Sequence, residues 1–216
     1  MPLHQKIQFN THTQIFIWKI TESYEQLFKE VILNPKCLLR INGMKSELHQ
    51  RGFLSVRKLL NEAGYTDFDL YYDEFGKPHL QDGKHISITH SHQFAAIIIS
   101  NETVGIDIEL QRQKIIRIAD KFCDTEFQYL IRDKTEEYIK KLTVIWGAKE
   151  AIFKIRNEKG ISFKDHIAVN EFDLNQIQAI ANLHFGGLHK EFNIYFKEVE
   201  DFTLVYALEV KVVKSK

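Results

Sequence analysis

The chain has 216 residues, which corresponds to one large or two small domains. Lys and Arg together number 29, as do Asp and Glu, so the charge gives no indication of bulk attraction to nucleic acid or an anionic membrane. Two cysteines without metal-like spacing, no apolar run near the ~18 residues of a membrane span, and an N-terminus unlike a signal peptide predict a soluble protein of the reducing cytoplasm.

The first half contains several segments with the hydrophobic periodicity of regular structure. We expect strands over 14–20, 85–90 and 94–99, helices over 23–33 and 45–64, and turn chemistry over 72–80. Ser23 and Gln26 have the spacing of a capping box, and Gly64 is expected to end the longer helix. The run 94–99 is apolar throughout, which favours a strand buried on both faces.

A short polar link, 100–103, joins this buried run to the strand-like "VGIDIEL" at 104–110. Two strands separated by so few polar residues predict a β-hairpin. That pairing would bring Glu109 back towards the turn that contains His90 and His92.

The second half has the same mixed pattern. We expect partly helical structure over 114–131, the longest helix over 135–156, and strands over 166–174, 178–185, 190–199 and 202–213. Helices interleaved with mainly antiparallel strands indicate an α+β fold.

The segment "VGIDIEL" carries two acidic residues on a strand that is otherwise apolar. Asp107 and Glu109 are two residues apart, so their side chains share one face. Two carboxylates this close repel each other unless a counter-charge is present. Either that face is solvated, or the carboxylates bind a cation.

The expected long helix contains "WGAKEAIFK", 146–154, in which Trp146, Glu150 and Lys154 are four residues apart and share one face. Glu150 and Lys154 have the spacing of a surface ion pair, worth about 0.3–0.5 kcal/mol. Alternatively, Glu150 adds a third carboxylate to Asp107 and Glu109, which would suit Mg²⁺ shared with a substrate phosphate. Lys154 would then be placed to meet a phosphate oxygen.

Four stretches in order, "GKPHL" at 76–80, "ISITHSHQFAAII" at 86–98, "VGIDIE" at 104–109 and "WGAKEAIFK" at 146–154, resemble the 4′-phosphopantetheinyl transferase superfamily. The chain is similar to its longer, surfactin-synthetase-activating type. The resemblance implies two similar α+β halves in a pseudo-twofold arrangement, 1–102 and 103–216, with the active site between them. The first half would contact the coenzyme A nucleotide, and the second would carry the metal site and the catalytic helix.

The implied reaction transfers 4′-phosphopantetheine from coenzyme A to a serine hydroxyl of an apo acyl or peptidyl carrier protein. The resemblance also implies a cytoplasmic monomer whose partners include neither nucleic acid nor membrane. Two alternatives stay open: a non-catalytic homologue that binds coenzyme A or a carrier protein, and a Mg²⁺-dependent phosphotransferase that acts on another nucleotide.

The resemblance also assigns roles to individual residues. It makes Asp107, Glu109 and Glu150 the ligands of Mg²⁺, with Mn²⁺ not excluded. It makes Glu126 an acid that assists proton transfer, so the base is Glu150 or Glu126, acting directly or through a metal-bound water. The expected coenzyme A contacts are Arg51, Arg57, Lys77, Thr89, His90 and Lys154, of which Lys154 meets the transferred phosphate.

Two glycines depart from expectation. Gly52 stands where the resemblance leads us to expect an acid, which weakens the assignment of Arg51. Gly147 is a poor helix former that costs roughly 1 kcal/mol relative to Ala.

Beyond the acid pair, Arg112, Lys114, Arg117 and Lys121 alternate with isoleucines. They form either a docking face for an acidic carrier protein or an ordinary amphipathic helix packed on its own core.

Overall fold

The computed structural model describes residues 3–211, which divide into two compact units between Thr103 and Val104. Within these residues, every helix is too short or too polar to cross a membrane.

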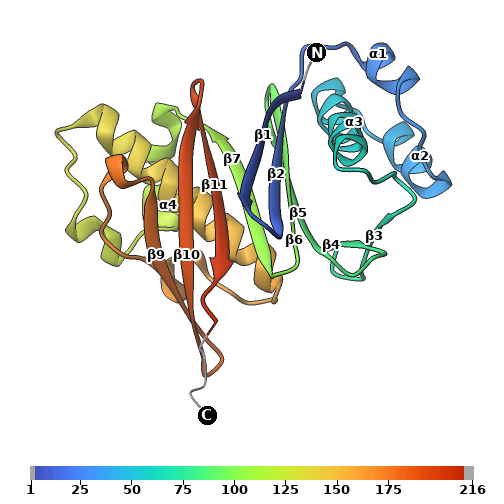
Figure 1. Ribbon diagram of the computed structural model, residues 1–216. Helices are drawn as coiled ribbons and strands as arrows, with labels where there is room; N and C mark the ends of the chain where they lie inside the picture. The colour runs from blue at the N-terminus through green and yellow to red at the C-terminus, as the bar shows by residue number, and fades with distance from the viewer. Residues whose placement is uncertain (1–2, 212–216) are drawn as a thin grey trace. The chain divides into compact units, whose positions relative to one another are not determined.

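The N-terminal unit is an antiparallel sheet with helices on one face (Figure 1). The strand order is β1-β2-β6-β5, and the strands are β1 Leu3–Asn10, β2 Thr13–Lys19, β5 His85–Ser91 and β6 Phe94–Ser100. The helices are α1 Tyr24–Lys29, α2 Pro35–Asn42 and α3 Glu47–Glu62, and a small hairpin pairs β3 Leu70–Tyr72 with β4 Pro78–Leu80. Helix α3 packs on β2 and β6 and buries the apolar face that its sequence predicts.

Local signals explain where these helices begin and end. Ser23 and Gln26 form the predicted capping box of α1. Beyond α3, Gly64 has a φ of +85°, a left-handed conformation that glycine adopts without strain. The strand β6 is buried along its whole length, as predicted. Strand β1 and helix α2 are additional elements that were not predicted from the sequence.

The C-terminal unit is a five-stranded antiparallel sheet covered by one long helix (Figure 1). The strand order is β7-β11-β10-β9-β8, and the strands are β7 Val104–Leu110, β8 Ile167–Val169, β9 Gln178–Phe185, β10 Leu188–Val199 and β11 Phe202–Glu209. The long helix is α4 Thr135–Arg156, the short helix is α5 Phe163–His166, and 3-10 helices span Gln113–Lys121, Thr125–Gln128 and Leu174–Gln176. Helix α4 lies mainly on β7 and β11. The α+β fold class predicted from the sequence is confirmed.

The expected hairpin between 94–99 and 104–110 is wrong. Strand β6 pairs with β2 on one side and with β5 on the other, so neither edge of β6 is open to β7. Strand β7 pairs instead with β11 in the second sheet, and the link 100–103 connects the two units. Strand pairing therefore does not bring Glu109 towards His90. The expected strand 202–213 ends at Glu209, and residues 212 and 213 lie outside the described residues.

Candidate active site

Two glycines allow helix α4 to lie unusually close to strands β7 and β11, of which β7 carries the acids. A Cβ atom added at Gly105 of β7 would lie 2.0 Å from the carbonyl oxygen of Ala151, so the backbones of strand and helix are almost in contact. A Cβ atom at Gly147 of α4 would lie 2.6 Å from Val205 Cγ2 on β11. Gly147 therefore costs helix propensity but permits this close packing. Because Gly105, Asp107 and Glu109 alternate along β7, their shared face is turned towards α4.

The shared face brings an acid and a base together. Asp107 is 4% exposed, and its Oδ1 accepts a hydrogen bond from Lys154 Nζ at 2.8 Å. The same ammonium group donates to the carbonyl oxygen of Ile106 at 2.8 Å. Lys154 thus crosses from α4 to β7 instead of pairing along its own helix with Glu150. Since Asp107 is buried, neither a solvated strand face nor a simple surface Glu–Lys pair describes this arrangement.

Glu150 lies half-buried beside this pair. Burial, followed by repulsion from Asp107 and with a smaller contribution from Glu109, raises the pKa of Glu150 to about 7, although Lys154 opposes the rise. The three carboxylates therefore interact electrostatically, as the shared strand face and the helix spacing predict. Together they carry more negative charge than the single ammonium group of Lys154 balances.

The chemistry of this donor set fits a hard divalent cation. Oxygen ligands from two or three carboxylates suit Mg²⁺, and a dication would remove the repulsion that raises the pKa of Glu150. Among residues 3–211, the side chains do not form a preassembled group of three or more ligands. One of the candidate ligand oxygens, Asp107 Oδ1, accepts a hydrogen bond from Lys154 Nζ instead.

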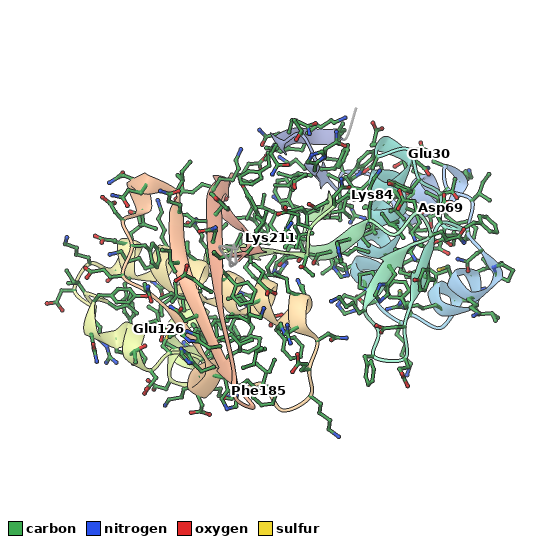
Figure 2. All side chains as sticks on the ribbon, turned by 60° about the horizontal axis from the view of Figure 1, so that its bottom comes forward. Glu30, Asp69, Lys84, Glu126, Phe185 and Lys211 are labelled. Atoms are coloured by element: carbon green, nitrogen blue, oxygen red, sulfur yellow. The ribbon has the colours of Figure 1, made fainter. Side chains whose placement is uncertain are left out.

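Glu126 belongs to a different cluster of the same unit. It lies in the 3-10 helix Thr125–Gln128 and is 1% exposed (Figure 2). Its Oε1 is 2.6 Å from Lys149 Nζ and accepts a hydrogen bond from the Val169 amide, and its Oε2 accepts one from the Asp124 amide. Lys149 is completely buried and also donates to the carbonyl oxygens of Phe122 and Phe163. A carboxylate with both oxygens bonded in this way holds neighbouring segments of the C-terminal unit together.

In the N-terminal unit, His90 lies at the exposed end of β5, against helix α3. A Cβ atom added at Gly52 would lie 3.0 Å from both Cγ and Nδ1 of His90, so the imidazole rests on the space that glycine leaves. His49, one turn earlier on α3, has its ring centroid 6.4 Å from that of His90. The glycine that departs from the expected pattern therefore provides a seat for His90. His49 was not predicted as a site residue, because one histidine on a helix gives no such signal.

The other expected nucleotide contacts have different environments. Arg51 of α3 is half-buried, and its Nη2 donates to the carbonyl oxygen of Ile20 at 3.2 Å. Lys77 is half-buried in the β3–β4 turn, where its backbone amide donates to Asp73. Thr89 is buried beside His90 in β5.

Arg57 is buried in the core of the N-terminal unit. It is 2% exposed, its Nε donates to Asp67 Oδ1 at 2.8 Å, and its Nη2 donates to Cys37 Sγ at 3.1 Å. Its guanidinium group also lies 3.5 Å from the centroid of the Phe53 ring. These contacts tie α2, α3 and the turn at Asp67 together and hold the guanidinium group away from the surface.

The basic segment after the acid pair forms the 3-10 helix Gln113–Lys121, preceded by Arg112. Ile115 and Ala119 are buried and face the core, whereas Ile116 is 37% exposed. The basic residues of this segment, Arg112, Lys114, Arg117 and Lys121, are all exposed.

Comparison with known proteins gives a consistent result. Residues 103–207 match the family model of the 4′-phosphopantetheinyl transferase superfamily. The chain is 32% identical over 111 residues to the 4′-phosphopantetheinyl transferase gsp of Aneurinibacillus migulanus, covering 50% of this chain and 45% of the relative. It is 26% identical over 151 residues to enterobactin synthase component D of Salmonella typhi, covering 68% of this chain and 61% of that protein.

A third relative is the 4′-phosphopantetheinyl transferase Sfp of Bacillus subtilis, 29% identical over 126 residues, or 55% of this chain and 56% of Sfp. The matches thus span about half the length of these curated relatives. The matched family region contains β7 and α4, and with them the whole acid and lysine cluster. The resemblance inferred from the motifs is confirmed for this region: residues 103–207 are similar to the 4′-phosphopantetheinyl transferase superfamily, as are the matched parts of the curated relatives.

Proposed function

We propose that the protein transfers the 4′-phosphopantetheine group of coenzyme A to a serine hydroxyl of an apo acyl or peptidyl carrier protein. The observation that carries this proposal is the cluster of Asp107, Glu109, Glu150 and Lys154, held together on β7 and α4 inside the region that matches the superfamily. In this proposal the C-terminal unit supplies the metal and catalytic residues, and the N-terminal unit supplies the nucleotide contacts.

Asp107, Glu109 and Glu150 would hold Mg²⁺, or Mn²⁺, which accepts the same hard oxygen ligands. A bound dication would neutralise charge on the diphosphate as the phosphorus–oxygen bond breaks. Lys154 would orient an oxygen of the transferred phosphate, because its ammonium group already lies at the acid cluster and is not fully buried.

The serine hydroxyl is a weak nucleophile and has to lose its proton. We assign proton acceptance to Glu150, whose carboxylate belongs to the cluster and is partly exposed. We assign Glu126 a structural role, since its two oxygens are bonded to Lys149 and to two backbone amides. The Glu126–Lys149 pair anchors α4 directly beside Glu150.

For the nucleotide we propose contacts from His90, Thr89, Arg51 and Lys77, with His90 at the 3′-phosphate. The exposure of His90 and its seat on Gly52 support this assignment. The burial of Arg57 and its pairing with Asp67 argue against a direct phosphate contact, and we propose that Arg57 stabilises α3 instead.

For the carrier protein we propose docking on the exposed basic residues around 112–121, with Ile116 as an apolar contact. Charges of this kind accelerate encounter with an acidic partner more than they hold the complex. We further propose a cytoplasmic monomer that binds neither nucleic acid nor membrane. Two buried cysteines that are not joined in a disulfide, Cys37 and Cys123, are compatible with a reducing compartment.

The test is incubation with coenzyme A, Mg²⁺ and a panel of apo carrier proteins, followed by intact mass measurement. We expect one carrier to gain the mass of one phosphopantetheine group, and we expect Asp107→Asn to abolish the gain while its circular dichroism is unchanged. Asp133→Asn, which removes an exposed acid outside the cluster, is the matched control. Thermal stabilisation by coenzyme A without transfer would replace the proposal with a non-catalytic binding protein. Stabilisation by a different nucleotide alone would replace it with another phosphotransferase.

A further inference from the structure

The hairpin formed by β9 and β10 places two histidines directly opposite each other. Its turn is Gly186–Gly187, whose φ angles of 58° and 80° require the left-handed region in which glycine is unstrained. Phe185, at the end of β9 (Figure 2), pairs with Leu188, and the next pair is His184 with His189. In a two-residue hairpin this second pair is not joined by backbone hydrogen bonds, so its side chains lie closest together.

The two imidazole rings are close and nearly parallel. Their centroids are 4.0 Å apart and their planes are inclined by 29°. Both residues are exposed. The neighbouring Lys190 projects from the other face, by strand alternation, and its ammonium group is paired with Glu209. The proposed transfer reaction uses neither histidine.

We propose that His184 and His189 form a bidentate site for a divalent transition-metal ion such as Cu²⁺, Ni²⁺ or Zn²⁺. Imidazole nitrogens bind such ions at ~2.0–2.1 Å, so two nitrogens on a tetrahedral ion lie about 3.3 Å apart. The stacked rings are close enough to share one ion, and binding requires them to rotate out of the stack until one nitrogen of each ring points at that ion. The backbone pairing of β9 with β10 already holds the two side chains opposite each other, so binding has to restrict only their side-chain rotation.

The remaining coordination positions belong to water. Among the described residues, histidine, cysteine and acidic side chains do not gather in threes as ready metal ligands, so two imidazoles are the protein's contribution. Glu191, two residues from His189 on the same strand face, lies diagonal to His184 and is the nearest acid by register. Nitrogen ligands select these ions over Mg²⁺, which prefers oxygen, and the order of affinity should be Cu²⁺ above Ni²⁺ and Zn²⁺.

The experiment is isothermal titration of the tag-free protein with Cu²⁺ and with Ni²⁺ in a buffer that contains excess Mg²⁺. We expect one equivalent to bind, and His184→Gln with His189→Gln to abolish that binding. Each single substitution should weaken binding by about tenfold or more, because the second imidazole acts as an intramolecular ligand. The matched control is His4→Gln with His12→Gln, two exposed histidines of the other unit, which should leave binding unchanged.

Electron paramagnetic resonance of the Cu²⁺ complex gives an independent readout. Two equivalent nitrogen ligands are expected in the wild-type spectrum, and one in either single variant. All four altered side chains are exposed, so the variants should keep the wild-type circular dichroism. Unchanged Cu²⁺ affinity in the double His184, His189 variant would overturn the proposal, as would a wild-type spectrum with a single nitrogen ligand.

Discussion

Glu150→Gln should stabilise the metal-free protein while it abolishes transfer. Burial and the neighbouring Asp107 raise the pKa of Glu150 from its ordinary value of 4.5 to about 7. The folded state therefore penalises the ionised carboxylate, and a neutral amide of nearly the same shape escapes the penalty. A cation site requires acidic groups to be held together although their repulsion lowers the stability of the fold. The stability of this variant therefore tests the cluster without a substrate.

The size of the effect follows from the pKa. A rise of the pKa from 4.5 to about 7 corresponds to roughly 3 kcal/mol of lost stability once the group is ionised, since one pKa unit corresponds to about 1.36 kcal/mol. Glu150 is only partly buried and solvent screens part of the interaction, so we expect about half of this, roughly 1.5 kcal/mol. In a protein of this size that raises Tm by about 3–6 °C.

The direction of the pKa shift gives the expected pH dependence of stability. Between pH 4.5 and 7 the folded state holds a proton on Glu150 that the unfolded state has lost, so the wild-type free energy of unfolding falls as pH rises through this window. The penalty is absent below pH 4.5 and complete above pH 7. The stability difference between Glu150→Gln and wild type should therefore grow from near zero at pH 4.5 to its full value at pH 8.

The assay is urea unfolding in EDTA at pH 4.5, 6, 7 and 8. All variants carry Trp18→Phe, so that Trp146 of α4, which packs on Phe122, is the only tryptophan. Glu136→Gln is the matched control, because it removes a charge from an exposed side chain on the same helix. A difference that stays flat across this pH range, or a Glu150→Gln variant less stable than wild type at pH 8, would refute the reasoning.

Three further predictions concern other residues. Lys154→Ala should lower kcat by about tenfold or more and change KM for coenzyme A less, measured by steady-state transfer, because an interaction made in the transition state is lost; an effect on KM alone would make Lys154 a binding residue only. Glu126→Gln should lower the free energy of unfolding measured in urea by about 3 kcal/mol, because Lys149 loses its buried partner. The double variant Glu126→Gln with Lys149→Met should regain stability and keep activity. A double variant that is stable but inactive would restore Glu126 as the base. Gly52→Ala should displace His90 and weaken coenzyme A binding several-fold by calorimetry, with little change for an analogue that lacks the 3′-phosphate; equal losses for both ligands would place His90 elsewhere.

Periodicity and capping predicted most of the elements that build the site. The β-branched alternation of 104–110 and the long helix over 135–156 have the predicted bounds, because both signals are local. The partner of β7 is not a local property. A four-residue link between two strands looks like a hairpin in sequence, and only the full set of pairings shows that β2 and β5 already occupy both edges of β6.

The close approach of α4 to β11 was also outside the reach of sequence reasoning. Gly147 counted as a cost to the helix, because its packing partner, Val205, is far away in the sequence. The same holds for Gly52, whose meaning depends on the ring of His90. A glycine inside a helix is therefore a marker for close packing, but the sequence does not identify the packing partner.

The burial of two functional-looking cations was within reach of the sequence. On α3, Arg57 follows the buried Phe53 by four positions and Val56 by one, and it precedes the buried Leu60 by three. This is the spacing of the core face of an amphipathic helix. A motif match assigns Arg57 to phosphate, whereas the helical period assigns it to the interior, where it finds Asp67.

Lys149 obeys the same rule on α4. It stands four positions after Ile145 and three before Ile152, both fully buried, and it is completely buried itself with Glu126 as its partner. Glu150, the next residue, is turned about 100° around the helix axis and reaches the edge of that face. Position in the helical period thus separates Lys149, which anchors the helix, from Glu150, which we propose as a site residue, although the two are adjacent in one motif. Since the period depends only on neighbouring residues, it should be applied to every motif residue before a catalytic role is carried over from a family.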